Sequence, residues 1–82
     1  MLDIKVLSGG CSRCEKLYEL TRQAVATLGV DAQVEKVTDS RRIREYGAGA
    51  IPALVINGRV VSSGVVPDIA EVTTFITTAL AS

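Results

Sequence analysis

The sequence predicts an α/β fold: a four-stranded mixed sheet with the element order β-α-β-α-β-β-α, flanked by helices on both faces. Three observations predict it. Apolar residues alternate at period two in residues 2–7 and 30–37, apolar residues recur at helical spacing in residues 12–28 and 68–80, and a turn dipeptide joins two short β-rich runs. With 82 residues and no internal repeat or linker, the chain is predicted to form one domain, residues 1–82, with a single modest core.

The first predicted strand covers residues 2–7, where apolar and charged side chains alternate. The period then changes to that of a helix over residues 12–28. One helical face carries apolar or small side chains, namely Cys14, Leu17, Thr21, Ala24, Val25 and Leu28. Gly29 follows as the expected C-cap, because glycine adopts the left-handed conformation without a steric penalty.

The second predicted strand covers residues 30–37, and a crossover of this length should make it parallel to the first strand with a right-handed connection. A short helix is expected at residues 41–46. Asp39 or Ser40 can cap its N-terminus and Gly47 would end it.

A β-hairpin is predicted at residues 53–56 and 59–62, because Asn57-Gly58 between two β-rich runs suits a type I′ turn. Pro67 fits the first turn of the last helix. One face of that helix carries Ile69, Val72, Ile76, Ala79 and Leu80. Its four threonines are weak helix formers, so the helix should depend on docking against the rest of the fold.

Composition excludes several function classes. Nine basic and nine acidic side chains give zero formal net charge, so we expect neither a nucleic-acid partner nor a membrane partner. No basic segment followed by a long apolar run is present at the start, and we expect a cytoplasmic protein. Two closely spaced cysteines are too few for a secreted disulfide framework, and in a reducing compartment such a pair is more often catalytic or metal-binding.

These two cysteines, Cys11 and Cys14, follow a turn at Gly9-Gly10 and stand at the start of the first predicted helix. Two thiols separated by two residues there can form a disulfide with each other. Unpaired backbone N–H groups and the positive end of the helix dipole favour an anion at this position, so the first thiol can ionise near neutral pH. The pattern therefore indicates redox chemistry.

Three segments carry a family resemblance: Gly10 to Leu17, Val34 to Asp39, and Pro52 to Gly64. Together with an apolar-Pro dipeptide that leads into a hairpin and a closing helix, they resemble the thioredoxin superfamily in its glutaredoxin-sized form. More closely, they are similar to the small prokaryotic thioredoxin-like proteins called redox-active disulfide protein 2. The resemblance covers almost the whole chain.

The resemblance implies roles for four residues. Cys11 matches the exposed, attacking cysteine, and Cys14 matches the more buried, resolving one. Ile51-Pro52 matches a dipeptide with a cis peptide bond beside the disulfide, where the backbone of Ile51 can pair with an extended partner. From thiol chemistry, and not from the resemblance, we expect two further residues between the cysteines to tune the pair: Arg13 adds a cation that favours the thiolate, and Ser12 can donate a weak hydrogen bond.

The sequence also departs from the best-known members of that superfamily. No Trp precedes Cys11, neither Pro nor Tyr stands between the cysteines, and the chain has no histidine to act as a base. Asp3 is a remote candidate for the buried acid of thioredoxins. Lys5, or water, is a candidate for proton transfer to Cys14.

We therefore predict a small thiol–disulfide oxidoreductase that needs no cofactor besides the Cys11–Cys14 pair and binds no metal. Its expected partners are a disulfide-containing protein and an electron-donating reductase or low-molecular-weight thiol, and we expect a monomer. A surface strip of Ile51, Val65 and Val66 is a candidate docking surface.

Four alternatives remain open from the residues alone. The cysteines could be a structural or incidental pair. The chain could also be an interaction module that keeps the fold and its cysteines but has lost turnover. They could bind Cu(I) in a soft-metal carrier, although that fold has the order β-α-β-β-α-β and ends on a strand. A zinc site is less favoured, because zinc normally takes four ligands and the chain offers two cysteines and no histidine.

Two further groups have a structural and a functional interpretation. Arg41, Arg42 and Arg44 are expected to form a solvated helix face rather than a docking patch. Tyr18 and Tyr46 are expected to pack at the edge of the core rather than contact substrate.

Overall fold

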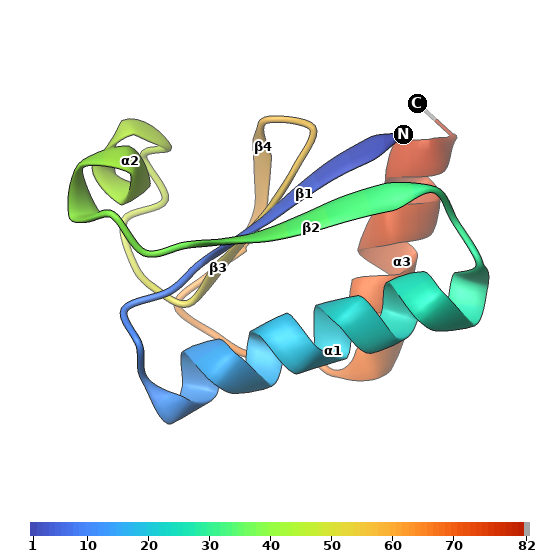
Figure 1. The fold of residues 1–82 in the computed structure, drawn as a ribbon, viewed down its shortest axis with the longest axis horizontal. Helices are drawn as coiled ribbons and strands as arrows, with labels where there is room; N and C mark the ends of the chain where they lie inside the picture. Colours follow the sequence, from blue (N-terminus) through green and yellow to red (C-terminus); the bar gives the residue numbers. More distant parts are fainter. Residues whose placement is uncertain (82) are drawn as a thin grey trace.

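The computed structural model, which describes residues 1–81, has the predicted element order (Figure 1). Its elements are β1 (Leu2–Leu7), α1 (Ser12–Leu28), β2 (Ala32–Val37), α2 (Ser40–Glu45), β3 (Ala53–Ile56), β4 (Arg59–Ser63) and α3 (Ile69–Leu80). The strands form one four-stranded sheet in the order β2-β1-β3-β4. β1 and β2 are parallel and the other two pairings are antiparallel, so the predicted mixed sheet is confirmed.

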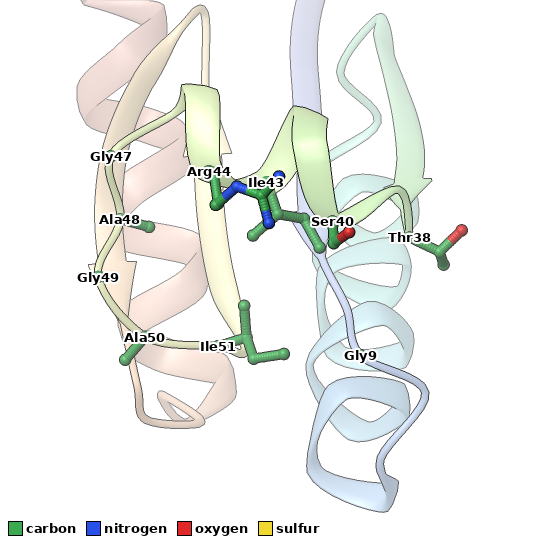
Figure 2. A pocket seen from close by; sticks show the side chains of 10 residues that line it. All are labelled: Gly9, Thr38, Ser40, Ile43, Arg44, Gly47, Ala48, Gly49, Ala50 and Ile51. Carbon is green, nitrogen blue, oxygen red and sulfur yellow. The ribbon is translucent and has the colours of Figure 1, made fainter.

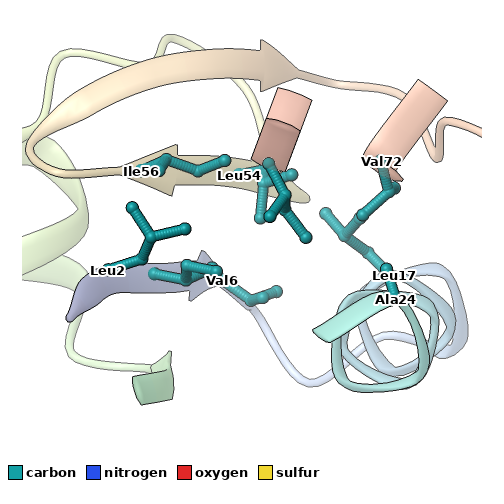
Figure 3. Packing of buried hydrophobic residues seen from close by; sticks show 9 residues of the cluster. Leu2, Val6, Leu17, Ala24, Leu54, Ile56 and Val72 are labelled. Atoms are coloured by element: carbon teal, nitrogen blue, oxygen red, sulfur yellow. The ribbon is translucent and has the colours of Figure 1, made fainter. Parts of the chain in front are cut away.

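Helices cover both faces of this sheet, as predicted. α1 and α3 pack together on one face, and α2 lies on the other (Figure 1). The larger core cluster fills the first interface with side chains of β1, β3, α1 and α3, including Leu2, Val6, Leu17, Leu54 and Val72 (Figure 3). A smaller cluster under α2 contains Leu7, Val37, Ala53 and Val55.

Most predicted boundaries are confirmed, and the differences have local causes. β2 begins at Ala32 rather than at residue 30, because its first partner on β1 is Leu2 and no earlier β1 residue is available to pair. Asp39 caps α2, so that helix starts one residue early, at Ser40. In the hairpin, Asn57 (φ 52°) and Gly58 (φ 82°) both have the positive φ that a type I′ turn requires.

The start of α3 differs from the prediction. Pro67 precedes the helix instead of lying in its first turn, and Asp68 is the N-cap. The Asp68 carboxylate accepts a hydrogen bond from the Glu71 N–H (2.9 Å), and the Glu71 carboxylate accepts one from the Asp68 N–H (3.2 Å). This reciprocal capping box corresponds to the Asp-x-x-Glu spacing of Asp68 and Glu71, a signal that is visible in the sequence.

The buried face of α3 also differs in part. Val72 and Ile76 are buried, and Phe75 and Ala79 pack against the core cluster. Ile69 and Leu80, which the helical spacing places on the same apolar face, are however 38% and 50% exposed. They lie at the two ends of the helix, beyond the surface that α3 covers, and helical spacing alone does not show where that surface ends.

Tyr18 and Tyr46 are partly buried against the two core clusters, which agrees with the predicted packing role. Within residues 1–81, no helix combines the length and the apolar character that crossing a bilayer requires.

Candidate functional site

The two cysteines lie where β1 turns into α1. The turn is held at Ser8, a buried residue whose backbone N–H donates to the Val37 carbonyl (2.9 Å). The Ser8 hydroxyl oxygen accepts a hydrogen bond from the N–H of Gly10, and the positive φ of Gly10 (84°) turns the chain towards the helix. Cys11 is then the N-cap of α1, and it forms a disulfide with Cys14 across a Cα–Cα separation of 5.1 Å.

The two sulfur-bearing residues differ in access to solvent. Cys11 is exposed, whereas Cys14 is fully buried on the core face of α1. The backbone N–H of Cys14 donates a hydrogen bond to Cys11 Sγ (3.1 Å), as an N-cap side chain accepts from the first turn of a helix. The exposed sulfur therefore sits at the positive end of the helix dipole with a backbone donor aimed at it.

Arg13 lies between the cysteines but is bound elsewhere. Its Nη2 donates to the carbonyl of Gly64 (2.8 Å), and the N–H of Gly64 donates to the carbonyl of Pro52 (2.9 Å). The side chain thus connects the start of α1 to the loop after β4 and, through it, to Pro52. The sequence placed Arg13 next to the sulfur as a tuning charge, and it could not reveal this partner 51 residues away.

Ser12, the other residue between the cysteines, is exposed, and its side chain has no hydrogen-bond partner within residues 1–81. The donor to the Cys11 sulfur is therefore the Cys14 backbone and not the Ser12 hydroxyl. The sequence does predict this donor, because the first backbone N–H groups of any helix lack a partner within the helix and the sequence predicts a helix start here.

Ile51 and Pro52 are brought to the same site. Their peptide bond is cis, which is the geometry that the resemblance implied. Pro52 is buried, whereas Ile51 is 39% exposed. Among the residues that the structure describes, none bonds to the backbone N–H or C=O of Ile51, since the pairing of β3 starts only at Ala53.

The side chain of Ile51 lies close to the backbone of Gly9, and only glycine leaves room for it there. A Cβ atom at Gly9 would lie 2.6 Å from Cδ1 of Ile51, so any other residue would displace the Ile51 side chain.

Of the predicted docking strip, Ile51 and Val65 are exposed, but Val66 packs against the core cluster. The strip is therefore narrower than predicted, because Val66 turns inwards at the approach to α3.

A groove of about 600 Å³ opens beside Ile51, between the residue 47–51 segment, α2 and Gly9 (Figure 2). Its walls are mainly apolar or small. The lining residues are Gly9, Thr38, Ser40, Ile43, Arg44, Gly47, Ala48, Gly49, Ala50 and Ile51.

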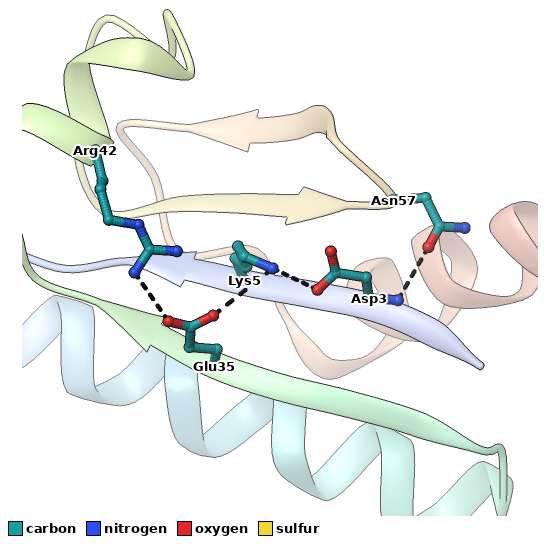
Figure 4. A network of polar contacts seen from close by, with 5 residues as sticks. All are labelled: Asp3, Lys5, Glu35, Arg42 and Asn57. Carbon is teal, nitrogen blue, oxygen red and sulfur yellow. Dashed lines mark hydrogen bonds and ion pairs between the residues drawn. The ribbon is translucent and has the colours of Figure 1, made fainter.

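The structure does not bring Asp3 or Lys5 to the cysteines. Both project from the sheet face opposite α1, where Lys5 pairs with Asp3 (2.5 Å) and Glu35 (3.7 Å), and Glu35 pairs with Arg42 (3.0 Å) (Figure 4). The hydrogen bond from Arg42 lowers the pKa of Glu35, and the hydrogen bond to Asp3 raises the pKa of Lys5. The suggested roles of Asp3 and Lys5 in proton transfer are therefore wrong, because residues 3 and 5 alternate with the core-facing residues of β1.

The three arginines of α2 also divide. Arg41 and Arg44 are exposed, as expected for a solvated face, while Arg42 is half-buried in the pair with Glu35.

Across residues 1–81, no three His, Cys, Asp or Glu side chains gather closely enough to hold a metal ion.

Comparison with known proteins points in one direction. The family described as "Thioredoxin domain" matches residues 2–77. A thioredoxin of Methanothermobacter thermautotrophicus is 35% identical over 72 residues, which cover 88% of this chain and 94% of that protein. A thioredoxin of Methanocaldococcus jannaschii is 33% identical over 72 residues, covering 88% of this chain and 83% of that protein.

Proposed function

This chain belongs to the family of thioredoxin domains, and from that premise we propose that its Cys11–Cys14 pair reduces or exchanges disulfides of protein substrates through a mixed-disulfide intermediate. The chain is a thioredoxin-like protein with a Cys-x-x-Cys disulfide, and these features are consistent with a thiol–disulfide oxidoreductase. Within that family, we assign it to the small prokaryotic group called redox-active disulfide protein 2. The three segments quoted from the sequence support that assignment.

The proposed cycle starts from the reduced pair. The Cys11 thiolate attacks one sulfur of a substrate disulfide, forms a mixed disulfide and releases the other substrate sulfur as a thiolate, which takes up a proton. The Cys14 thiol then loses its proton and attacks Cys11 Sγ. This step releases the second substrate thiolate and leaves the Cys11–Cys14 disulfide that the structure contains. Two electrons pass to the substrate, and a dithiol reductase or a low-molecular-weight thiol must return them.

One observation carries this assignment of roles. Cys11 is the exposed sulfur and accepts a hydrogen bond from the Cys14 N–H at a helix N-terminus, while Cys14 is fully buried. An exposed sulfur with a backbone donor suits the attacking thiolate, because the donor and the helix dipole both favour the anion. A buried sulfur suits the resolving thiol, because only the neighbouring mixed disulfide can reach it.

We assign substrate-backbone binding to Ile51 and Pro52. The unpaired N–H and C=O of Ile51 beside the disulfide can bond to an extended segment of substrate, as in the addition of a strand to a sheet edge. Buried Pro52 holds that segment of backbone in place. Thiolate tuning by Ser12 and Arg13 stays a prediction from thiol chemistry: Arg13 is bound to the Gly64 carbonyl, and the Ser12 hydroxyl makes no hydrogen bond within residues 1–81.

For partners, we propose a disulfide-containing protein and a reductase or small thiol that recharges the pair. The relatives named above are thioredoxins, which supports this class of partner. We further propose that the protein acts as a monomer. We also propose that it works in the cytoplasm, since only two cysteines, closely spaced, fit a reducing compartment.

The first test is a redox titration of the purified protein against glutathione or dithiothreitol buffers, with thiol alkylation measured by mass. We expect one two-electron transition that converts both thiols together. The same sample should be checked for Cu(I). A pair that resists reversible oxidation but holds Cu(I) tightly at a defined stoichiometry would contradict the proposal and favour a soft-metal carrier.

The assignment of roles has its own test. Cys14→Ser should accumulate a mixed disulfide with a protein substrate through Cys11, because no thiol remains to resolve it. Cys11→Ser is the matched control and should trap little, since Cys14 is buried. Intact mass under non-reducing conditions distinguishes the two variants. Equal trapping by both variants, or trapping mainly by Cys11→Ser, would reverse the roles.

A further inference from the structure

The groove beside Ile51 has an unusual distribution of charge. Of the ten residues that line it, Arg44 is the only charged one, and the others are apolar, glycine, or the hydroxyl residues Thr38 and Ser40. Figure 2 shows the Arg44 side chain reaching from α2 over the space between the residue 47–51 segment and Thr38. A single cation thus stands at an otherwise uncharged surface.

This cation is not used within the fold. Among residues 1–81, no carboxylate or carbonyl pairs with the Arg44 guanidinium, whereas neighbouring Arg42 is committed to Glu35. Arg44 is also exposed, so its five N–H donors are open to an incoming acceptor.

The groove continues the surface that the proposed function assigns to substrate. Ile51 belongs to both, and Gly9, which lines the groove, packs against Ile51 and lies two residues before Cys11. An extended chain paired with the Ile51 backbone, with its cysteine at Cys11, would therefore pass its neighbouring residues into the groove. Every second side chain of such an extended segment points to the same side. Two such side chains could therefore face the groove, one against its apolar wall and one at Arg44.

We infer that this groove binds the residues flanking the target cysteine of a protein substrate, and that Arg44 selects segments that carry an acidic side chain there. The inference rests on the proposed disulfide reduction. The occupant is a polypeptide, because the unpaired N–H and C=O of Ile51 at the edge of the groove suit an extended main chain. A small anionic thiol such as glutathione is the competing occupant that the test distinguishes. An apolar side chain two residues from the acidic one would point to the same side of the extended chain and pack against the wall formed by Ile43, Ala48 and Ala50.

The test uses the reduced full-length protein and short peptides, each with one cysteine and linked as symmetrical disulfides. The peptides differ only at one position flanking the cysteine, which is Glu, Gln or Lys, and both flanks are tried. Acid quenching followed by alkylation gives the second-order rate constant for oxidation of the protein. For one flank, we expect the Glu peptide to react faster than the Gln peptide by roughly two- to fivefold, the range of a solvent-exposed ion pair.

Variants then assign the preference to its residue. Arg44→Gln should bring the ratio of the Glu and Gln rate constants to about one. Arg44→Glu should make the Lys peptide react faster than the Glu peptide. Arg41→Gln is the matched control, because it removes the same charge from the same helix outside the groove lining, and it should keep the wild-type ratio. Added salt should reduce the wild-type ratio towards one.

The outcomes separate this inference from the proposed function. If the wild type oxidises with none of the peptides, disulfide reduction itself is wrong. If it reacts with Glu and Gln peptides equally, or if Arg41→Gln loses the ratio as fully as Arg44→Gln, the groove does not select acidic segments. If Arg44→Gln instead slows reaction with oxidised glutathione and leaves the peptide ratio unchanged, the occupant is a small anionic thiol and the inference is overturned.

Discussion

Arg13, a residue inside the Cys-x-x-Cys motif, is tied to the backbone of a loop that is distant in the sequence. Its guanidinium bonds to the Gly64 carbonyl, and the Gly64 N–H bonds to the Pro52 carbonyl. Gly64 has a φ of 76°, and a Cβ there would lie 3.1 Å from the Cβ of Ala50, so a larger residue would disturb this junction. These bonds hold the loop after β4 to the start of α1 and to Pro52.

Removing that bond should therefore affect stability and substrate binding together. We expect Arg13→Ala to lower the free energy of unfolding by about 0.5–1 kcal/mol, the net value of one hydrogen bond at an exposed site. It should also raise KM for a protein disulfide more than it lowers kcat. Denaturant unfolding and steady-state kinetics measure the two effects.

Lys16→Ala is the control for charge, because Lys16 is an exposed cation near the same helix start whose side chain bonds to no other residue of 1–81. It should change neither quantity appreciably. If Arg13→Ala shifts the midpoint potential of the cysteine pair while stability and KM stay constant, Arg13 acts as a tuning charge after all.

Among the elements, α3 depends most on its surroundings. Three of its threonine hydroxyls donate to carbonyls within the helix, to those of Ile69, Ala70 and Thr74. Such back-bonding and β-branching make a poor helix in isolation. The helix is instead stabilised by burial of Val72 and Ile76 and by the capping box at Asp68.

The cap should therefore be measurable in global stability. We expect Asp68→Ala to lower the free energy of unfolding by about 1 kcal/mol, because it leaves N-terminal N–H groups of α3 without their acceptor. Asp31→Ala is the matched control, since the exposed Asp31 side chain makes no hydrogen bond within residues 1–81. Urea denaturation at constant pH compares the two. Equal losses in both variants would mean that the capping box contributes nothing specific.

At the scale of the whole molecule, the two faces of the sheet are stabilised differently. The face under α1 and α3 is covered by the larger apolar cluster, whereas the face under α2 combines a smaller cluster with the ion pairs of Asp3, Lys5, Glu35 and Arg42 (Figure 4). These pairs join β1 and β2 to α2 across a surface that water reaches. Stability from this face should consequently respond to pH and salt.

Glu35 gives that response a sign. The hydrogen bond from Arg42 lowers the pKa of Glu35 in the folded state, so the stabilisation is present above about pH 4.3, where an unfolded-state glutamate is ionised, and is lost as pH falls through the folded-state pKa. We expect Glu35→Gln to be less stable than the wild type at pH 7. The difference should shrink in acid and in high salt.

Thermal unfolding of both proteins between pH 3 and pH 7 measures this difference. Glu45→Gln is the control, because the exposed Glu45 carboxylate has no ion-pair partner among residues 1–81, and it should follow the wild-type curve. A deficit of Glu35→Gln that stays constant across this pH range would show that ionisation of Glu35 does not stabilise the fold.

The sequence by itself determined the features that depend on local periodicity and on single residues with special backbone preferences. Alternation and helical spacing predicted β1, α1 and β3 with their observed bounds, and Asn57-Gly58 predicted the hairpin turn. The position of Cys11 at a helix start predicted a sulfur that receives a backbone donor. Each of these depends on neighbours within a few residues along the chain.

Only the tertiary structure decided which distant groups meet. The bond from Arg13 to Gly64 spans 51 residues, and the groove at Arg44 needs α2, the residue 47–51 segment and Gly9 in one place. The same is true of Lys5, which pairs on the face away from the cysteines, and of the exposed ends of α3 at Ile69 and Leu80. The physical reason is that a side chain's partner depends on how whole elements pack, and the periodicity of one element contains no information about the shape and extent of the surface opposite it.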